Sequence, residues 1–140
     1  MKRTIAAAFA GSFLISGCVR TNAALIDPTV HLARTCPSAI KLYTTPDRVP
    51  KPYREVAILN AKGESNWSDE EDMIESMRDK ASEVGANGII LNSIDEPSAL
   101  TKVIGEVAKT GSQRKGKALA IYVPSDSTST ATVCASAKKG

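Results

Sequence analysis

Residues 68–91, SDEEDMIESMRDKASEVGANGIIL, carry the clearest structural signals in the chain. Ser68, followed three residues later by Glu71, forms a capping-box pattern for a helix N-terminus. The four acidic residues 69–72 place negative charge at the positive end of the helix dipole. Apolar residues recur at helical spacing: Met73, Met77, Ala81 and Val84. Since Gly85 supplies a left-handed stop, the pattern predicts a helix over residues 69–84.

Strand patterns lie on both sides of this helix. Residues 39–44 and 53–59 alternate between apolar and polar side chains, and residues 119–123 alternate in the same way before Pro124. Ile89-Ile90-Leu91 is apolar on both faces and reads as a buried central strand. Strand, helix and strand in succession predict a right-handed crossover, with the strands on either side of the helix running parallel. A short helix is expected over residues 97–109. The fold class is therefore α+β: a small mixed sheet of about four strands with one long helix packed on a face.

The first eighteen residues have the order of a secretory signal. Lys2 and Arg3 precede an apolar run of eleven residues, Ile5–Ile15, and then Ser16-Gly17-Cys18. As a helix the run would span about 16 Å, half of a ~30 Å hydrocarbon core, so it is too short for a stable membrane span.

The small residues before Cys18 resemble the lipobox of bacterial lipoproteins. The resemblance implies a signal peptide over residues 1–17, cleavage before Cys18, and acylation of Cys18 with fatty acids such as palmitate. Two or three acyl chains anchor a protein firmly to a bilayer. Val19 follows the cysteine where an Asp favours inner-membrane retention, so we expect the periplasmic side of the outer membrane rather than the inner membrane.

Composition excludes several functional classes. The chain has 140 residues, and without Lys2 and Arg3 it carries 16 basic side chains against 15 acidic ones. This balance argues against a nucleic-acid partner. One His and three Cys provide little material for a His-based active site or a four-ligand zinc site. No Ser-His-Asp set, Cys–His pair or placed carboxylate pair is evident, so we expect no enzyme activity, no metal and no cofactor.

The chain divides into four segments. After the signal peptide, residues 18–35 show no sustained periodicity and are expected to form a tether from the lipidated cysteine. Residues 36–124 form the globular domain. Residues 125–140 are rich in Ser, Thr and Ala and are expected to be a disordered tail, because they have too few large apolar residues to bury a core.

Short motifs in the domain resemble the RcsF-like family of outer-membrane stress-sensing lipoproteins and the small YbjQ-type domains. The motifs are Lys41-Leu42-Tyr43-Thr44, Lys51-Pro52-Tyr53-Arg54-Glu55-Val56, Ala81 with Gly85-Ala86-Asn87-Gly88-Ile89-Ile90-Leu91, and Gly116-Lys117-Ala118-Leu119-Ala120-Ile121. The resemblance implies the small α+β architecture, a lipoprotein setting and a role in the envelope stress response. RcsF-like proteins pair four cysteines across the sheet and have a long Pro-rich linker, whereas the sheet and helix predicted here contain no Cys.

Cys36 and Cys134 remain once Cys18 is acylated, an even pair in an oxidising compartment. An intramolecular disulfide would close a long loop and attach the tail to the start of the first strand. Free thiols or an intermolecular bridge are also compatible with the sequence.

Four other features have structural explanations. The acidic run at 69–72 lacks the Gly-containing turn of a calcium loop and is explained by helix capping. His31 lies alone in the tether, and a zinc site with Cys36 and Cys134 would lack a fourth ligand. The glycines of residues 85–88 follow a helix, whereas phosphate loops precede one, so they read as a cap and turn. Trp67 fits a hydrophobic staple at the helix start.

Two function hypotheses follow. The first is a membrane-anchored, non-enzymatic periplasmic lipoprotein that contacts an envelope protein partner, in stress sensing or as an accessory subunit. The alternative is a binding module for an anionic envelope component such as lipopolysaccharide or peptidoglycan. It would use Arg114, Lys115 and Lys117, which are expected in a basic turn over residues 110–117.

Overall fold

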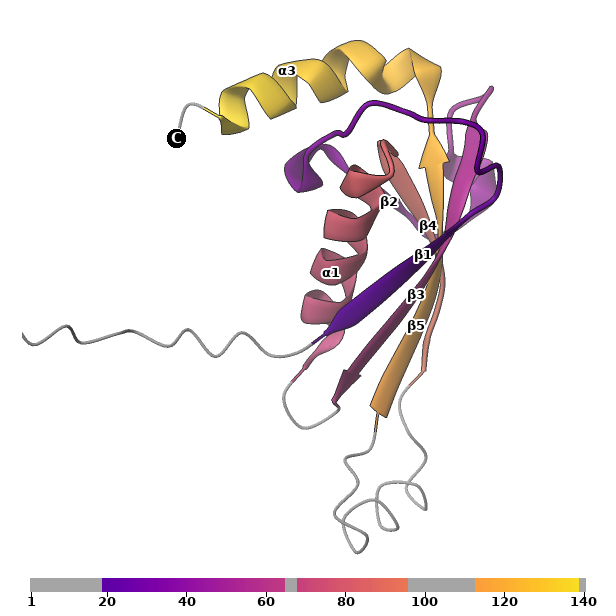
Figure 1. Ribbon diagram of the computed structural model, residues 1–140, viewed down its shortest axis with the longest axis vertical. Coiled ribbons are helices and arrows are strands. Elements are labelled where there is room, and N and C mark those ends of the chain that lie inside the picture. The colour runs from indigo at the N-terminus through magenta and orange to yellow at the C-terminus, as the bar shows by residue number, and fades with distance from the viewer. Residues whose placement is uncertain (1–18, 65–67, 96–112, 139–140) are drawn as a thin grey trace, which may run out of the picture.

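The computed structural model describes residues 19–64, 68–95 and 113–138. In these residues five strands form one mixed sheet, with one helix packed along a face and a second helix across one end (Figure 1). The strands are β1 (Arg20–Leu25), β2 (Lys41–Tyr43), β3 (Arg54–Glu64), β4 (Gly88–Asp95) and β5 (Gln113–Tyr122). The helices are α1 (Glu70–Glu83) and α3 (Ser127–Ala137), with short 3-10 turns η1 (Pro37–Ala39), η2 (Pro46–Arg48) and η3 (Pro124–Asp126). The fold is α+β.

The strand order across the sheet is β1-β3-β5-β4-β2. Neighbouring strands are antiparallel except β2 and β4, which are parallel. Since β3 and β4 both run antiparallel to β5, they point in the same direction, as the strand–helix–strand pattern predicted. They are not adjacent, however, because β5 lies between them.

Helix α1 begins one residue later than the sequence pattern suggested. Its N-cap is Asp69, whose carboxylate accepts from the backbone N–H of Asp72 at 2.9 Å. The Asp72 carboxylate in turn accepts from the Asp69 N–H at 3.0 Å. The expected capping box of Ser68 and Glu71 is therefore wrong. Ser68 is buried, and its hydroxyl donates to the carbonyl of Glu64 at 2.6 Å, so it serves the end of β3 rather than the helix.

The main core lies between α1 and the sheet. Met73, Met77 and Ala81 of α1 are fully buried, and they lie against small residues of the sheet. Ala61 of β3 is buried in this cluster, and a Cβ added to Gly116 of β5 would lie 2.5 Å from Met77 Cε. Each buried methionine contributes about 1.5–3 kcal/mol. We call the face toward α1 the inner face and the opposite face the outer face.

The turn after α1 requires glycine. Gly85 has φ of 80°, in the left-handed region, and a Cβ there would lie 2.4 Å from the Cβ of Leu32 and 2.8 Å from the carbonyl oxygen of Ala33. The segment that follows β1 thus packs directly on the end of the helix, which confirms the predicted stop at this glycine.

Two segments expected to lack regular structure are ordered elements. Residues 20–25, expected to belong to a tether, form β1, an edge strand paired antiparallel with β3. Residues 127–137, expected to be a disordered tail, form α3. Both expectations were wrong for the same reason: partners distant in the sequence stabilise these segments, so local composition carried no signal. The expected helix over residues 97–109 and the staple residue Trp67 lie outside the described residues.

Helix α3 is held to the rest of the domain by a few specific links. Cys36 and Cys134 form a disulfide, with Cα atoms 5.5 Å apart. Asp126, just before the helix, accepts from Lys41 Nζ at 3.0 Å. Thr130 is the buried residue of the helix. The attachment of α3 therefore depends on the cystine more than on a packed apolar face.

Within the described residues, no helix has the length and apolarity needed to cross a bilayer.

Candidate functional site

The outer face of the sheet changes character from one end to the other. Register pairing gives three successive cross-strand rows on β1, β3 and β5: Arg20–Lys62–Lys115, Asn22–Asn60–Lys117 and Ala24–Ile58–Leu119. Direct cross-strand partners share a face, and the intervening row of Thr21, Ala61 and Gly116 faces α1. The outer face therefore runs from cations, through amides and Lys117, to apolar side chains.

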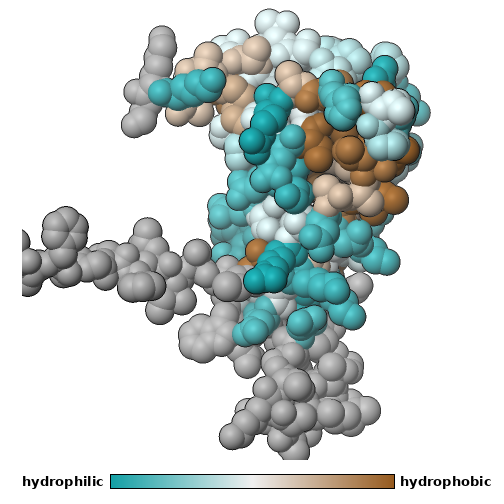
Figure 2. All heavy atoms as spheres, viewed as in Figure 1, coloured by the Kyte–Doolittle hydropathy of each residue, from teal (hydrophilic) through white to brown (hydrophobic). Residues whose placement is uncertain are grey.

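The apolar end of this face is unusually open to solvent. Ile58 is 48% exposed and Ile26, which directly follows β1, is 46% exposed. Leu25 at the end of β1 is 41% exposed but alternates to the other face, since its register partner Ala57 lies in the core against α1. Figure 2 shows hydrophobic residues gathered on the upper part of the molecule, on the side where β1 ends, with hydrophilic residues below them. Large apolar side chains exposed together are typical of a binding surface.

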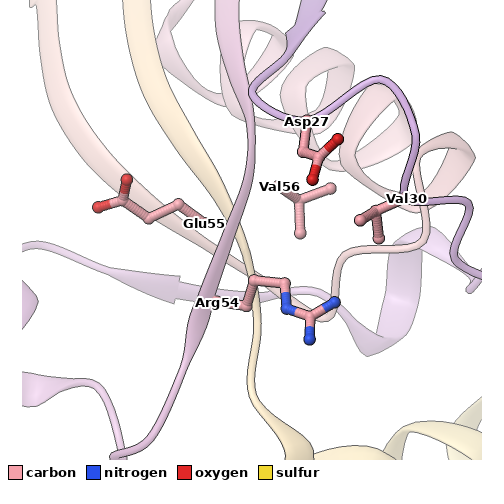
Figure 3. A pocket seen from close by; sticks show the side chains of 5 residues that line it. All are labelled: Asp27, Val30, Arg54, Glu55 and Val56. Atoms are coloured by element: carbon pink, nitrogen blue, oxygen red, sulfur yellow. The ribbon is translucent and has the colours of Figure 1, made fainter.

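A hollow of about 310 Å³ lies where β1 has ended and β3 begins. It is lined by Asp27, Val30, Arg54, Glu55 and Val56. Figure 3 shows Asp27 and Arg54 on either side of the two valines, whereas Glu55 points away from them. The backbone N–H of Ile26 donates to the carbonyl of Val56 at 2.9 Å and fixes the loop over this hollow. The hollow thus presents an apolar floor between one carboxylate and one guanidinium.

The Asp27 carboxylate is hydrogen-bonded within its own turn. The hydroxyl of Thr29 donates to Asp27 Oδ1 at 2.6 Å and the Thr29 backbone N–H donates to the same oxygen at 2.9 Å. These two hydrogen bonds, with a smaller contribution from the charge of Arg54, hold the pKa of the Asp27 carboxyl below its usual value. A carboxylate stabilised in its charged form is a poor general base at neutral pH but a good fixed partner for a cation or a donor.

The three predicted anion-contact residues do not form one cluster. Arg114, Lys115 and Lys117 lie in strand β5 and not in a polar turn. Because side chains alternate along a strand, Arg114 points to the inner side, where its Nη1 donates to the carbonyl of Ser68 at 3.1 Å. Lys115 and Lys117 are exposed on the outer face. The expectation of a shared basic loop is therefore wrong.

Sequence reasoning missed two other cations of the outer face. Arg20 falls within the expected tether over residues 18–35, and Lys62 lies beyond the strand expected at residues 53–59. Only the pairing of β1, β3 and β5 brings them beside Lys115. The alternation of small or apolar with polar side chains over residues 59–64, L-N-A-K-G-E, was the available signal that β3 continues past the predicted end at Leu59.

The remaining predicted site residues do not belong to the described part of this face. Cys18 lies outside the described residues, directly before Val19. Cys36 and Cys134 are paired with each other, so their thiolates are not available to a zinc ion together with the exposed His31. Within the described part of the chain, no group of three or more His, Cys, Asp or Glu side chains is placed to hold a metal ion.

A second concave region borders helix α1. A groove of about 390 Å³ is lined by Leu42, Glu70, Glu71, Ile74, Glu75 and Arg78, and a neighbouring hollow of about 280 Å³ by Pro37, Ser38, Glu75, Arg78 and Asp79. Carboxylates and Arg78 line both of them, and the Ser38 hydroxyl in the second donates to Cys36 Sγ at 3.4 Å.

Comparisons with known proteins give the fold. No protein-family model and no curated protein matches the chain. The crystal structure of the Francisella virulence factor FvfA is similar, with a TM-score of 0.50 at 14% sequence identity. The match covers 73% of this chain and 96% of that chain. At this identity the likeness supports the α+β fold and nothing finer.

Proposed function

We propose that this chain is a lipid-anchored periplasmic protein that acts by binding another envelope protein and not by catalysis. The observation that supports the protein contact is the open apolar end of the outer face, where Ile58 and Ile26 are each nearly half exposed. Large apolar side chains exposed together are the usual anatomy of a protein-binding patch.

Lipid anchoring rests on the lipobox-like residues before Cys18, and the outer-membrane location on Val19. Envelope stress sensing rests on the resemblance to the RcsF-like family and belongs to the same proposal. The alternative, a binding module for lipopolysaccharide or peptidoglycan, is weakened because Arg114 faces α1 and leaves only two of its three residues on a common surface.

Anchoring is tested by replacing Cys18 with serine. We expect the wild-type chain to fractionate with outer membranes and to carry acyl groups on residue 18, as measured by mass spectrometry of the N-terminal peptide. Cys18→Ser is expected to lose the acyl groups. A wild-type chain that keeps Met1, carries no acyl group and fractionates with soluble proteins would contradict the proposal.

Protein contact is tested by a photo-crosslinking amino acid at position 58, with position 51 as the exposed control. We expect a discrete protein adduct from position 58 in living cells, under rest or envelope stress, and none from position 51. Ile26→Asp, which places a charge within the exposed apolar end, is expected to reduce the adduct at least several-fold. An adduct unaffected by Ile26→Asp, or no adduct under either condition, would count against this surface.

A further inference from the structure

The cationic end of the outer face is a second surface with a chemistry of its own. Arg20, Lys62 and Lys115 occupy directly opposite positions on three adjacent strands, and Lys117 follows Lys115 two residues along the same face. All four side chains are exposed. They belong to separate parts of the chain, so only the fold brings them together.

Repulsion between these cations favours the binding of an anion. Like charges directly opposite each other on neighbouring strands destabilise a sheet, and Lys62 has a cation on both sides. The ion pairs of the described side chains are Arg34–Glu83, Lys41–Asp126 and Lys80–Glu83, and none involves this row. Glu64 lies two residues beyond Lys62 on the same face, and the row ends on β4 at Asp95, the register partner of Lys115. Cations still predominate.

The position of the row relative to the anchor indicates the partner. Arg20 is two residues after Cys18, so extended chain separates them by at most about 7 Å. That distance is within the Debye length of about 8 Å at physiological ionic strength. A bilayer that holds an acyl chain on Cys18 would therefore lie within electrostatic reach of these cations.

We propose that Arg20, Lys62, Lys115 and Lys117 bind the phosphate headgroups of anionic glycerophospholipids, so that the domain stands on this end of the sheet. The inference deepens the proposed function and rests on the lipid anchor at Cys18. It also separates the two surfaces: Ala24, level with Ile58, lies four residues along β1 from Arg20, or about 13 Å. The apolar end remains clear of the membrane for a protein partner.

The test uses residues 18–140 with Cys18→Ser, a chain that contains every described strand and helix and carries no acyl group. Circular dichroism and disulfide mapping verify its fold. Binding is measured by co-sedimentation with vesicles of equal phosphatidylglycerol and phosphatidylcholine, and with pure phosphatidylcholine. The test variant is Lys62→Gln/Lys115→Gln/Lys117→Gln. The matched control, Arg48→Gln/Lys51→Gln/Lys138→Gln, removes the same charge from exposed positions elsewhere.

Three cations near an anionic surface contribute on the order of 100-fold in affinity at low salt. We expect the test variant to lose most of that affinity for phosphatidylglycerol vesicles, the control to keep it, and 0.5 M salt to abolish binding by all chains. Equal loss in both variants, equal binding to the two vesicle types, or binding only to lipopolysaccharide micelles would overturn the assignment. Because the chain lacks the acyl group, a negative result here is independent of whether Cys18 is lipidated in cells.

Discussion

Replacing Cys36 and Cys134 with serine is expected to lower the free energy of unfolding by about 4.7 kcal/mol, as measured by urea denaturation at neutral pH. The disulfide spans a sequence separation of 98 residues, and closing a loop of that size restricts the unfolded chain by about this amount in the chain-entropy model. The total free energy of unfolding of a native protein is about 5–15 kcal/mol, so this loss is a large fraction of the stability.

The double variant should also release α3 while the sheet and α1 stay folded. Helix α3 buries Thr130 but none of its large apolar side chains, whereas the core cluster of α1 and the sheet contains no residue of α3. Limited proteolysis should then cut within residues 127–138 of the variant and of the reduced wild-type chain, but not of the oxidised one. An unfolding free energy unchanged from that of the oxidised wild type would contradict the structural role of the cystine.

Asn87→Leu is expected to lower the free energy of unfolding by about 3 kcal/mol. The Asn87 side chain is fully buried, its Nδ2 donates to the Val123 carbonyl at 2.8 Å, and its Oδ1 accepts from the Val123 N–H at 2.7 Å. Leucine is similar in size but leaves a buried donor and a buried acceptor unsatisfied at the end of β5. The measurement is urea denaturation beside Asn22→Leu, an exposed control on β1 that should change stability by less than about 0.5 kcal/mol.

Asn87→Asp separates the hydrogen-bond explanation from simple packing. Its carboxylate would be buried and would face the Val123 carbonyl oxygen, so its pKa should be higher in the folded than in the unfolded state. A group with a raised folded pKa contributes stability at low pH and loses it as the pH rises. The free energy of unfolding of Asn87→Asp should therefore differ less from that of the wild type at pH 4 than at pH 7. A difference that does not depend on pH would favour packing as the explanation.

The sequence predicted the elements whose signals are local. Helix α1 was expected over residues 69–84 and spans Glu70–Glu83, because the acidic first turn, the apolar period and the Gly85 stop are local signals, although the capping box pairs Asp69 with Asp72. β2, β4 and β5 were each recognised from alternation or a buried run, although β4 extends beyond Leu91 and β5 begins before residue 118. A strand was also expected at 53–59, but β3 continues to Glu64 because its polar outer residues pair with β1 and β5.

The sequence failed where structure depends on distant partners. The β1 residues RTNAAL have neither a strong apolar alternation nor turn signals, and they become a strand because β3 offers an edge. The Ser-, Thr- and Ala-rich segment of α3 lacks a core face and is held by a cystine to residue 36. The sequence did not show the cationic row as one group for the same reason. Arg20, Lys62 and Lys115 become neighbours only through the register of the sheet.

The place of β5 in the sheet has a consequence for the order in which the protein can fold. β5 is hydrogen-bonded to both β3 and β4, yet it is the last strand in the sequence. Until residues 113–122 have emerged, the β1–β3 pair and the β2–β4 pair have no common partner and remain separate halves. Sheets closed by such distant pairings fold more slowly than helical domains of the same size. A chain synthesised from its N-terminus therefore lacks its last strand until the end of synthesis, and until then the edge of β3 stays open to chaperones and to unwanted pairing.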